Sequence, residues 1–550
     1  MTKKLSQTII CLLVTICMLA VTFTGCGNND KQSDNYLIVQ TSTAPNTIDP
    51  AAASSEADLI VIYHCMRGLF RQVEEGGVEL ENAESYQVSE DGCTYTFTLK
   101  DAQWSNGTPV TANDYVFAWR RAVSGQFDYS DIFASAAHIK GAAEIVAGTA
   151  DPETLGVTAV DDHTLVVELD TPVPYLTALL AMGPFCPINE EFYNSLEEGM
   201  FGTSPDTYLS NGPFVLGDYI PGTACIRLDR NENYYDADEV TLDGIKFQVV
   251  SNNDVAFSTY EIGQMDVIRL NTSRLETLRE DPEYADQVSM EPTAALFYLT
   301  YNIASDTSNG ALGNVNLRRA IACSINRDYI VNNVLHGIGT PSFGVIPNQM
   351  VINTETGEDF EKEAIEKYGI VDADAETAQK YLELARQELG QGDIVLTLSG
   401  MNTTTQLLEA IKSMVESTLD GVTLNIQVLP PAEATTNCSN HDYDIALLGW
   451  IGDYPDPTTF LNLWLKGSSY DYGQWNNEEY TELVEKCSGE YALDYDKRWE
   501  ALHEAEDILI DQQPITPIYT NQNAIMVNPR VSGIQDTTTF VADYSRVRLK

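Results

Sequence analysis

The chain has 550 residues, 43% of them hydrophobic and 20% charged, a balance typical of a folded protein that excludes extended disorder. Its 31 lysine and arginine residues stand against 81 aspartate and glutamate residues, so the formal net charge is −50. This charge excludes nucleic acid and anionic lipid headgroups as primary partners, and it reflects either solubility alone or a preference for cationic ligands.

The N-terminus has the pattern of a secretory signal. Two lysines precede an uncharged apolar run, residues 9–23, which is shorter than the roughly 20 residues that a membrane-spanning helix needs. Small residues then precede Cys26, as in a bacterial lipobox, so we expect residues 1–25 to be removed and the Cys26 thiol to be lipidated. Residues 26–35 would form the lipidated cysteine and its polar tether. The alternative is a soluble secreted protein in which Cys26 is incidental.

The remaining cysteines show no recognisable framework. Of the ten cysteines in the chain, three lie at or before position 26, and the others are widely spaced without a C-x-x-C pair. Zinc ribbons and thioredoxin-like chemistry are therefore disfavoured, and a chain of this length does not need disulfides to stabilise its core. Buried free thiols are the simplest interpretation, while any pairing stays open.

The first half of the chain after the signal alternates strand-like and helix-like segments. Tyr95, Phe97 and Leu99 alternate with threonines, which predicts a half-buried strand. Thr111 stands three residues before Asp114, a capping-box spacing that predicts the start of an amphipathic helix. Further strands are predicted near residues 165–169, 214–219, 226–229 and 245–250.

From about residue 310 the pattern changes to longer helices and short apolar strands. Helices are predicted over residues 373–389, 406–419, 477–488 and 493–512, and strands over 394–398, 422–429 and 443–449. Gly390 is placed to end the first of these helices in the left-handed conformation. Strand, helix and strand at this spacing predict βαβ units, and residues 515–548 read as further short strands.

Motifs for catalysis and metal binding are absent from the sequence. There is no G-x-S-x-G, H-E-x-x-H or G-K-[ST], and none of the six histidines has another histidine four residues away. We therefore expect no catalytic residue, no cofactor and no metal. Asp453 and Asp456 could act as general acid and base, which keeps a secreted carboxylate-dependent hydrolase as an alternative.

The most informative segment follows an apolar strand and reads Gly449-Trp450-Ile451-Gly452-Asp453-Tyr454-Pro455-Asp456-Pro457. The prolines fix φ and make the loop rigid, so Asp453 can be held beside the Trp450 ring. A carboxylate in such a partly dry position suits a cationic ligand group, to which it makes charge-assisted hydrogen bonds. The alternative is a turn aspartate beside a core tryptophan.

Together with the lipobox, this segment resembles the family 5 extracellular solute-binding proteins, the peptide-binding lipoproteins of ABC importers. The most characteristic match runs from Trp104 to Trp119, W-S-N-G-T-P-V-T-A-N-D-Y-V-F-A-W, for which we expect a structural role in the core. Other matches follow in the family's order: Ile48-Asp49-Pro50, Gly68-Leu69-Phe70, Pro172-Val173-Pro174-Tyr175, Asn211-Gly212-Pro213-Phe214, Arg230-Asn231-x-x-Tyr234-Tyr235, Arg318-Arg319-Ala320 and Ile325-Asn326-Arg327. The resemblance spans residues 36–545.

The resemblance implies an α/β fold, two-lobed and periplasmic-binding-protein-like, with an additional inserted domain and a hinged ligand cleft. The division it implies places lobe I in residues 36–66, 191–295 and 520–550. The inserted domain II would occupy residues 67–190, and lobe III residues 296–519.

The resemblance also implies a ligand site. In peptide-binding members, the aspartate matching Asp453 pairs with the ligand's α-ammonium group, and backbone groups matching Gly449 and Ile451 hydrogen-bond the extended peptide. The remaining expected ligand-binding residues are Trp450, Tyr298, Tyr129, Ser54 and Glu56. Leu447 stands where some peptide binders have an arginine, so ligand length and side-chain preference do not carry over.

The function implied is that of a lipid-anchored, extracytoplasmic solute-binding protein on the bacterial cell membrane. It would capture peptides in an interlobe cleft and deliver them to the permease subunits of an ABC importer, without being an enzyme. A peptide-sensing receptor of the same fold is the second possibility, and the secreted hydrolase is the third.

Overall fold

The computed structural model describes residues 35–550 except 74–76, 125–126, 354–355, 391, 536 and 538–540. The expected signal peptide and Cys26 lie outside the described residues. None of the helices in the described part of the chain is long and apolar enough to cross a membrane.

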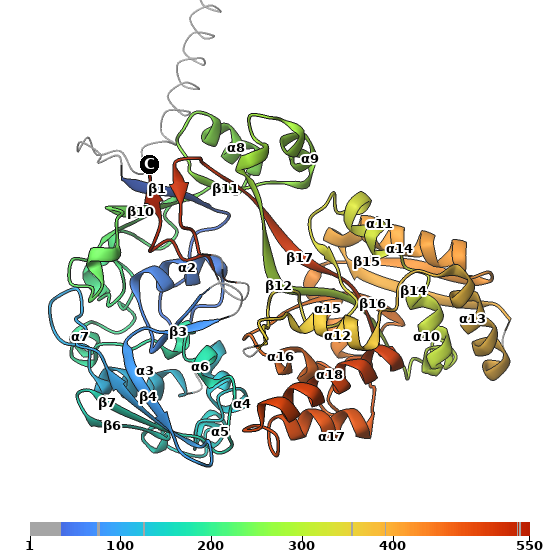
Figure 1. The fold of residues 1–550 in the computed structure, drawn as a ribbon, viewed down its shortest axis with the longest axis horizontal. Coiled ribbons are helices and arrows are strands. Elements are labelled where there is room, and N and C mark those ends of the chain that lie inside the picture. Colours follow the sequence, from blue (N-terminus) through green and yellow to red (C-terminus); the bar gives the residue numbers. More distant parts are fainter. Residues whose placement is uncertain are drawn as a thin grey trace, which may run out of the picture.

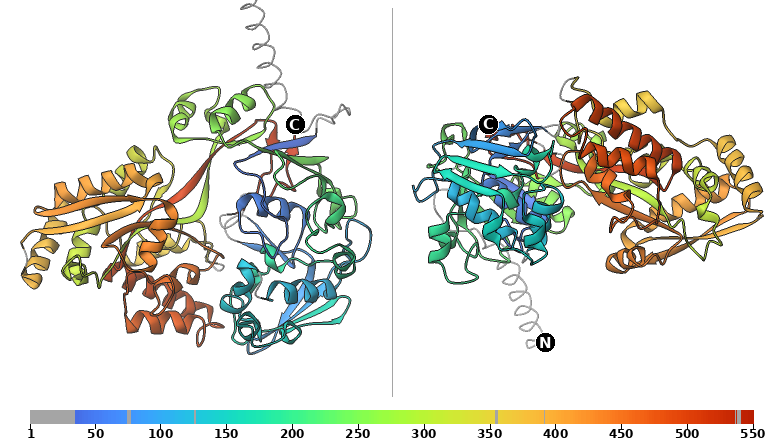
Figure 2. Two further views of the ribbon diagram at one scale, coloured as in Figure 1. Left: turned by 180° about the vertical axis from the view of Figure 1, so that it is seen from behind. Right: turned by 90° about the horizontal axis from the view of Figure 1, so that it is seen from below.

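The molecule consists of two lobes joined by the long strands β12 (Val288–Tyr301) and β17 (Ile515–Val527), as Figure 1 shows. The first lobe carries the chain before β12, coloured blue to green, and the residues after β17, coloured red. The second lobe, yellow-green to red, carries the chain between these two strands. The views from behind and from below show the same separation (Figure 2). The predicted α/β, two-lobed fold is therefore confirmed.

One large mixed sheet runs through both lobes. Its strands, in spatial order, are β15 (Val422–Leu429), β14 (Ile394–Met401), β16 (Ile445–Ile451), β12, β17, β11 (Val267–Arg269), β1 (Tyr36–Thr41), β10 (Gly244–Val249), β9 (Cys225–Arg230) and β8 (Phe214–Asp218), with β13 (Thr340–Pro341) beside β17. The β12–β17 pair is antiparallel and forms the connection between the lobes.

The β12–β17 ladder is irregular in its middle. Its register shifts between Pro292 and Leu296. Proline has no backbone N–H for a ladder, and a register shift bends a strand locally. We therefore expect a change in the angle between the lobes to bend this stretch.

The first lobe contains a small antiparallel sheet beside the large one. Its strands are β4 (Ala83–Val88), β5 (Thr94–Leu99), β7 (Thr164–Glu168) and β6 (Val157–Asp161), in that order. The predicted alternation in β5 is confirmed, because Tyr95, Phe97 and Leu99 are all buried. The remaining elements of this lobe are β2 (Phe70–Gln72), β3 (Val78–Leu80), β18 (Val531–Ser532), β19 (Arg548–Leu549), α2 (Glu56–Cys65), α3 (Ala112–Ala122), α4 (Ile132–Ser135), α5 (Ala142–Val146), α6 (Leu176–Leu179), α7 (Glu190–Ser195), α8 (Asn253–Glu261) and α9 (Thr272–Glu280).

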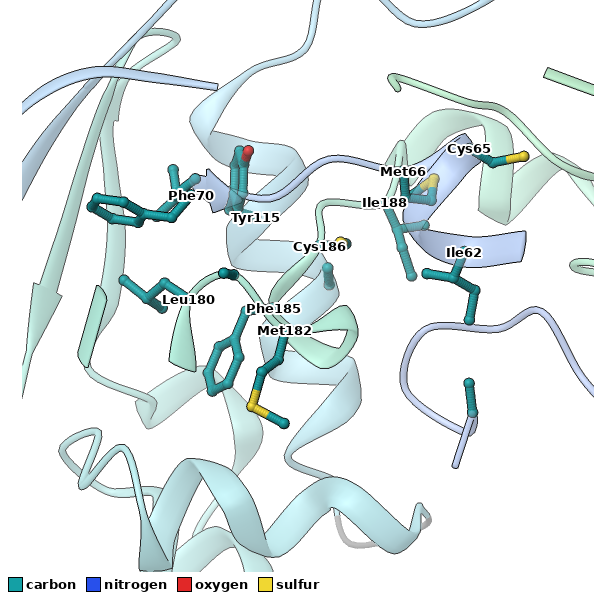
Figure 3. Packing of buried hydrophobic residues seen from close by; sticks show 14 of the residues in the cluster. Ile62, Cys65, Met66, Phe70, Tyr115, Leu180, Met182, Phe185, Cys186 and Ile188 are labelled. Carbon is teal, nitrogen blue, oxygen red and sulfur yellow. The ribbon is translucent and has the colours of Figure 1, made fainter. Parts of the chain in front are cut away.

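The segment from Trp104 to Trp119 is part of the core of this lobe, as predicted. The Trp104 indole N–H donates to Asp114 at 3.2 Å, and the Trp119 indole N–H donates to the Phe185 carbonyl at 3.0 Å. Thr111 and Asp114 form the predicted capping box of α3. Figure 3 shows Phe185 and its neighbour Cys186 packed beside α3. These residues stabilise the lobe and are not among the described residues that line the interlobe cavity.

The chain returns to the first lobe at its C-terminus, which lies beside β1 (Figure 1). Arg67 donates to Asp543 at 2.8 Å, and both side chains are buried. The Tyr544 backbone N–H donates to His64 Nε2 at 2.9 Å. The last residues therefore hold α2 in place, although they lie more than 470 positions away in sequence.

The second lobe follows the predicted βαβ pattern. Its helices are α10 (Val315–Ala322), α11 (Arg327–Tyr329), α12 (Phe360–Tyr368), α13 (Ala375–Leu389), α14 (Thr405–Thr418), α15 (Pro431–Ser439), α16 (Thr458–Leu461), α17 (Glu478–Cys487) and α18 (Tyr495–Gln512). β14 and β15 are parallel and joined by α14. Gly390 ends α13 with φ 66°, which confirms the predicted terminator.

Residues 515–548 differ from the prediction of short strands only. They begin with the long strand β17, and the short strand β18 follows. Pro517, Asn521 and Asn523 interrupt the apolar alternation within β17, which is why the sequence does not show its length. The simplest interpretation, buried free thiols, holds for five cysteines of the described part of the chain: Cys65, Cys186, Cys323, Cys438 and Cys487. Cys93 is a free thiol that is only half-buried, and Cys225 is disulfide-bonded.

Candidate ligand site

A cavity of about 420 Å³ lies between the lobes, against the irregular stretch of β12. The first lobe contributes α2 with the residues before it, β11 and part of the C-terminal segment. The second lobe contributes the end of β16 and the loop that follows. Five of the residues predicted from the sequence line this cavity together: Ser54, Glu56, Tyr129, Ile451 and Asp453.

The other three predicted residues are not among the described residues that line the cavity. Tyr298 is buried in β12, and its ring meets Trp464 edge-on at 5.7 Å. Trp450 packs edge-on against Tyr470 at 4.6 Å. Gly449 is exposed and opposes Phe297 across the β12–β16 ladder. Trp450 and Gly449 thus lie in β16, the strand that leads to Asp453, whereas Tyr298 lies in the core.

Asp453 is the carboxylate that the second lobe presents to the cavity. Its backbone N–H donates to the Thr459 hydroxyl at 2.9 Å, which fixes the start of the loop. The residue keeps an exposed surface, but the surrounding protein withdraws its carboxyl group from bulk solvent. This desolvation raises the pKa of Asp453 to about 6, against the opposing effect of the hydrogen bond with Thr459. Among the described residues, no basic side chain contributes to this shift. The arrangement leaves room for a positive charge from a ligand.

The loop after Asp453 is held from both lobes. The Tyr454 ring stacks on Tyr175 of the first lobe with centroids 4.5 Å apart and planes 7° apart. Asp456 accepts a hydrogen bond from Arg498 at 2.8 Å, and both side chains are about 8% exposed. Because Asp456 is buried and ion-paired, it is not placed to share a proton with Asp453, which removes the support for an acid–base pair.

A charged pair from the first lobe also faces the cavity. Arg269, at the end of β11, forms an ion pair with Glu56 in the first turn of α2. The Arg269 backbone N–H donates to the Gln40 side chain at 2.8 Å. Arg269 was missed in the sequence, where the only signal is a charged residue directly after the buried residues Val267 and Ile268.

No metal centre accompanies these groups: the described residues contain no cluster of three or more His, Cys, Asp or Glu side chains suited to a metal ion. The cavity instead combines isolated charges with aromatic walls that include Tyr63 and Tyr129. Cavities of this kind bind a ligand through a few polar anchors and much apolar contact.

Two lobes, an irregular strand pair between them and a cavity lined by both define the class of two-lobed extracytoplasmic binding proteins. The sequence profile described as bacterial extracellular solute-binding proteins, family 5 Middle, matches residues 77–472. The chain belongs to this family, whose members are binding proteins and not enzymes.

Named relatives match this chain over nearly its whole length, and the solved structures among them share its fold. The oligopeptide-binding protein OppA of Bacillus subtilis is 31% identical over 557 residues, covering 97% of each chain. Listeria monocytogenes OppA bound to peptide is 29% identical, covers 94% of this chain and 100% of its own, and gives a TM-score of 0.71. The unliganded open form of the murein tripeptide binding protein MppA is 26% identical, covers 94% and 98%, and gives 0.79.

The lobes of this structure resemble an open arrangement. The unliganded open form superposes better than the peptide-bound protein although its sequence is less similar. Because TM-scores over two rigid lobes depend on the angle between them, the difference indicates that the angle between the lobes is nearer to that of the open form, although the lobes still touch at Tyr175 and Tyr454. This agrees with the exposure of Asp453 at the cavity.

Proposed function

We propose that this chain captures peptides between its lobes and delivers them to the permease subunits of an ABC importer. The observation that carries the proposal is Asp453, a fixed carboxylate in the interlobe cavity to which no described basic side chain is paired. The names of the relatives support a peptide as the ligand, since the Bacillus protein is an oligopeptide-binding protein and the Listeria protein holds peptide.

In this proposal Asp453 binds the α-ammonium group of the peptide. The charge-assisted hydrogen bond strengthens when the cleft closes, because water leaves the site. The ligand contacts both lobes only in the closed state, so it favours closure by its differential affinity. Scattering of the protein with saturating peptide should then give a smaller radius of gyration than without.

The backbone of β16 is the proposed template for the peptide chain. β14 pairs with β16 only at Ile445 and Ala446 among the described residues, so the edge of β16 from Leu447 onward has no strand on that side. Gly449 and Ile451 are exposed on this stretch. An extended peptide that adds to such an edge is bound through its backbone, so many sequences are tolerated.

The test is a cycle with two proteins and two peptides. Asp453→Ala should weaken binding by roughly 30-fold or more, since truncating one partner of a desolvated charge pair costs about 2–5 kcal/mol. N-acetylation of the peptide should weaken binding to the wild type strongly and to the variant much less. Asp453→Asn separates charge from shape. Calorimetry showing additive losses, with coupling below about 0.5 kcal/mol, would make Asp453 a turn residue.

The proposed location is the outer face of the bacterial cell membrane, with lipid on Cys26. This part rests on the sequence pattern before Cys26, which lies outside the described residues. Cys26→Ser should release the protein from the membrane fraction into the soluble fraction. Retention of the variant at the wild-type level would contradict lipid anchoring at this residue.

Import and sensing use the same ligand site, so they are distinguished by what happens to the peptide. Uptake of labelled peptide that depends on this protein supports import, whereas a response without uptake supports a receptor. Recovery of intact peptide after incubation excludes the hydrolase. Mass spectrometry of ligand released from purified protein by denaturation would identify the natural peptides. The division into lobe I, domain II and lobe III given above is part of the same proposal.

A further inference from the structure

The part of the cavity lining that comes from the first lobe contains a second charged side chain that can bind a ligand, Arg269. β11 is paired with β1 through Val267 and with β17 through Arg269. Gln40 fixes the Arg269 backbone and is itself buried, with its amide donating to the Val250 carbonyl at 2.8 Å. The Arg269 guanidinium therefore extends into the cavity from a rigid base.

The ion pair between Arg269 and Glu56 is weak. The Arg269 and Glu56 side chains are 33% and 52% exposed, and ion pairs of that exposure contribute little to stability. Glu56 stands in the first turn of α2, whose capping box of Ser55 and Asp58 does not involve it. Glu56 can therefore leave Arg269 without disturbing the helix.

The charges in the cavity restrict where a ligand carboxylate can bind. Three acidic side chains line it, Glu56, Glu291 and Asp453, and Arg269 is the only basic one among the described lining residues. A ligand carboxylate is repelled at every other charged position and attracted at this one. Guanidinium groups bind carboxylates through planar, paired hydrogen bonds, and the bond strengthens as the cleft closes.

We propose that Arg269 receives a carboxylate of the bound peptide and exchanges Glu56 for it. The inference rests on the proposed peptide-binding function and narrows the ligand class to peptides with a carboxylate within reach of the cavity. That carboxylate is either the C-terminus of a short peptide or an acidic side chain near the amino end of a longer one. In both cases the ammonium group binds the second lobe and the carboxylate binds the first.

The experiment measures affinity by calorimetry for two matched peptide pairs. One pair is trialanine with a free or an amidated C-terminus. The other pair consists of two pentapeptides with amidated C-termini. Both have alanine at every position except the first, which is aspartate in one peptide and asparagine in the other. For the wild type, loss of the carboxylate in at least one pair should weaken binding by about tenfold or more, typical of a charge-assisted hydrogen bond. The pair that responds identifies the source.

The variants assign the effect to Arg269. In Arg269→Met, and independently in Arg269→Gln, the two members of the responding pair should bind within about twofold of each other. Glu56→Gln makes the opposite change: it removes the carboxylate that competes for Arg269 and should bind the acidic peptide more tightly than the wild type. Thermal unfolding of each variant checks that it is folded.

The outcomes separate the two proposals. If N-acetylation weakens binding but neither carboxylate exchange does, the ammonium site stands and the assignment of Arg269 falls. The assignment also falls if the responding pair shows the same ratio in the wild type and in both Arg269 variants. If no peptide binds the wild type, the proposed function falls together with it.

Discussion

The two walls of the cavity hold their charges in opposite ways. On the second lobe, Asp453 begins a loop that is fixed by Thr459, by the Tyr454 stack and by the buried pair of Asp456 with Arg498. On the first lobe, Arg269 and its partner form an exposed pair that can separate at little cost in free energy. In the two proposals, the ammonium group, common to all peptides with a free amino end, would bind the rigid wall, and the carboxylate, which varies among peptides, would bind the adaptable one.

The largest expected effect tests the rigidity of the second-lobe wall. Arg498→Met leaves Asp456 buried without its cation, which typically lowers the free energy of unfolding by about 3–5 kcal/mol. Arg230→Met is the matched control, because Arg230 pairs with Glu232 at the surface and such pairs contribute about 0–1 kcal/mol. Urea denaturation of both variants makes the comparison. Equal midpoints would mean that the Asp456 pair does not stabilise the wall.

A smaller effect is expected from pH. The pKa of Asp453 is raised to about 6 by desolvation, while a peptide's α-ammonium group stays protonated below pH 7. Only the carboxylate binds the ammonium, so affinity is full above this pKa and falls as the pH falls through it, by about tenfold between pH 7 and pH 5. Calorimetry across this range should show the loss in the wild type and a flat profile in Asp453→Asn. A flat wild-type profile would contradict the raised pKa.

The smallest effect concerns the contact between the walls. Tyr175→Leu removes the ring that stacks on Tyr454, a contribution of about 0.5–1.5 kcal/mol beyond buried area. We expect peptide affinity to fall by roughly fivefold, because the Asp453 loop loses its support from the first lobe. Tyr175→Phe keeps the ring and should bind like the wild type. If Tyr175→Leu and Tyr175→Phe bind peptide with equal affinity, the stack does not position the loop.

The sequence predicts the parts of the site that depend on neighbouring residues. Asp453 is recognisable because its loop, its prolines and the preceding apolar strand are contiguous, and the α3 capping box is equally local. Arg269 is not recognisable, because it enters the site through pairings with strands far away in sequence, such as Arg269 with Ile525. Patterns read along the chain do not contain such contacts.

The direction of side chains on the strands is the other feature of the site that the sequence does not reveal. Tyr298 was expected to face the ligand, but it lies among the buried residues of β12 together with Leu296, two positions before it. A strand alternates its faces, so a shift of one residue decides between core and cavity. In β17 the same alternation places Asn521 and Asn523 at the cavity, and these polar positions conceal the strand in the sequence.

The return of the C-terminus to the first lobe has a consequence for biosynthesis. β1 is among the first residues to leave the ribosome, yet its lobe is completed only by β17 and by Asp543 and Tyr544 near the end of the chain. Until the chain is complete, Arg67 lacks Asp543 and the β11 edge lacks its neighbour. The first lobe is thus the first to be synthesised and the last to be completed. Its contacts join residues far apart in the sequence, which slows its folding. The incomplete first lobe exposes apolar surface and strand edges throughout that interval and must avoid aggregation.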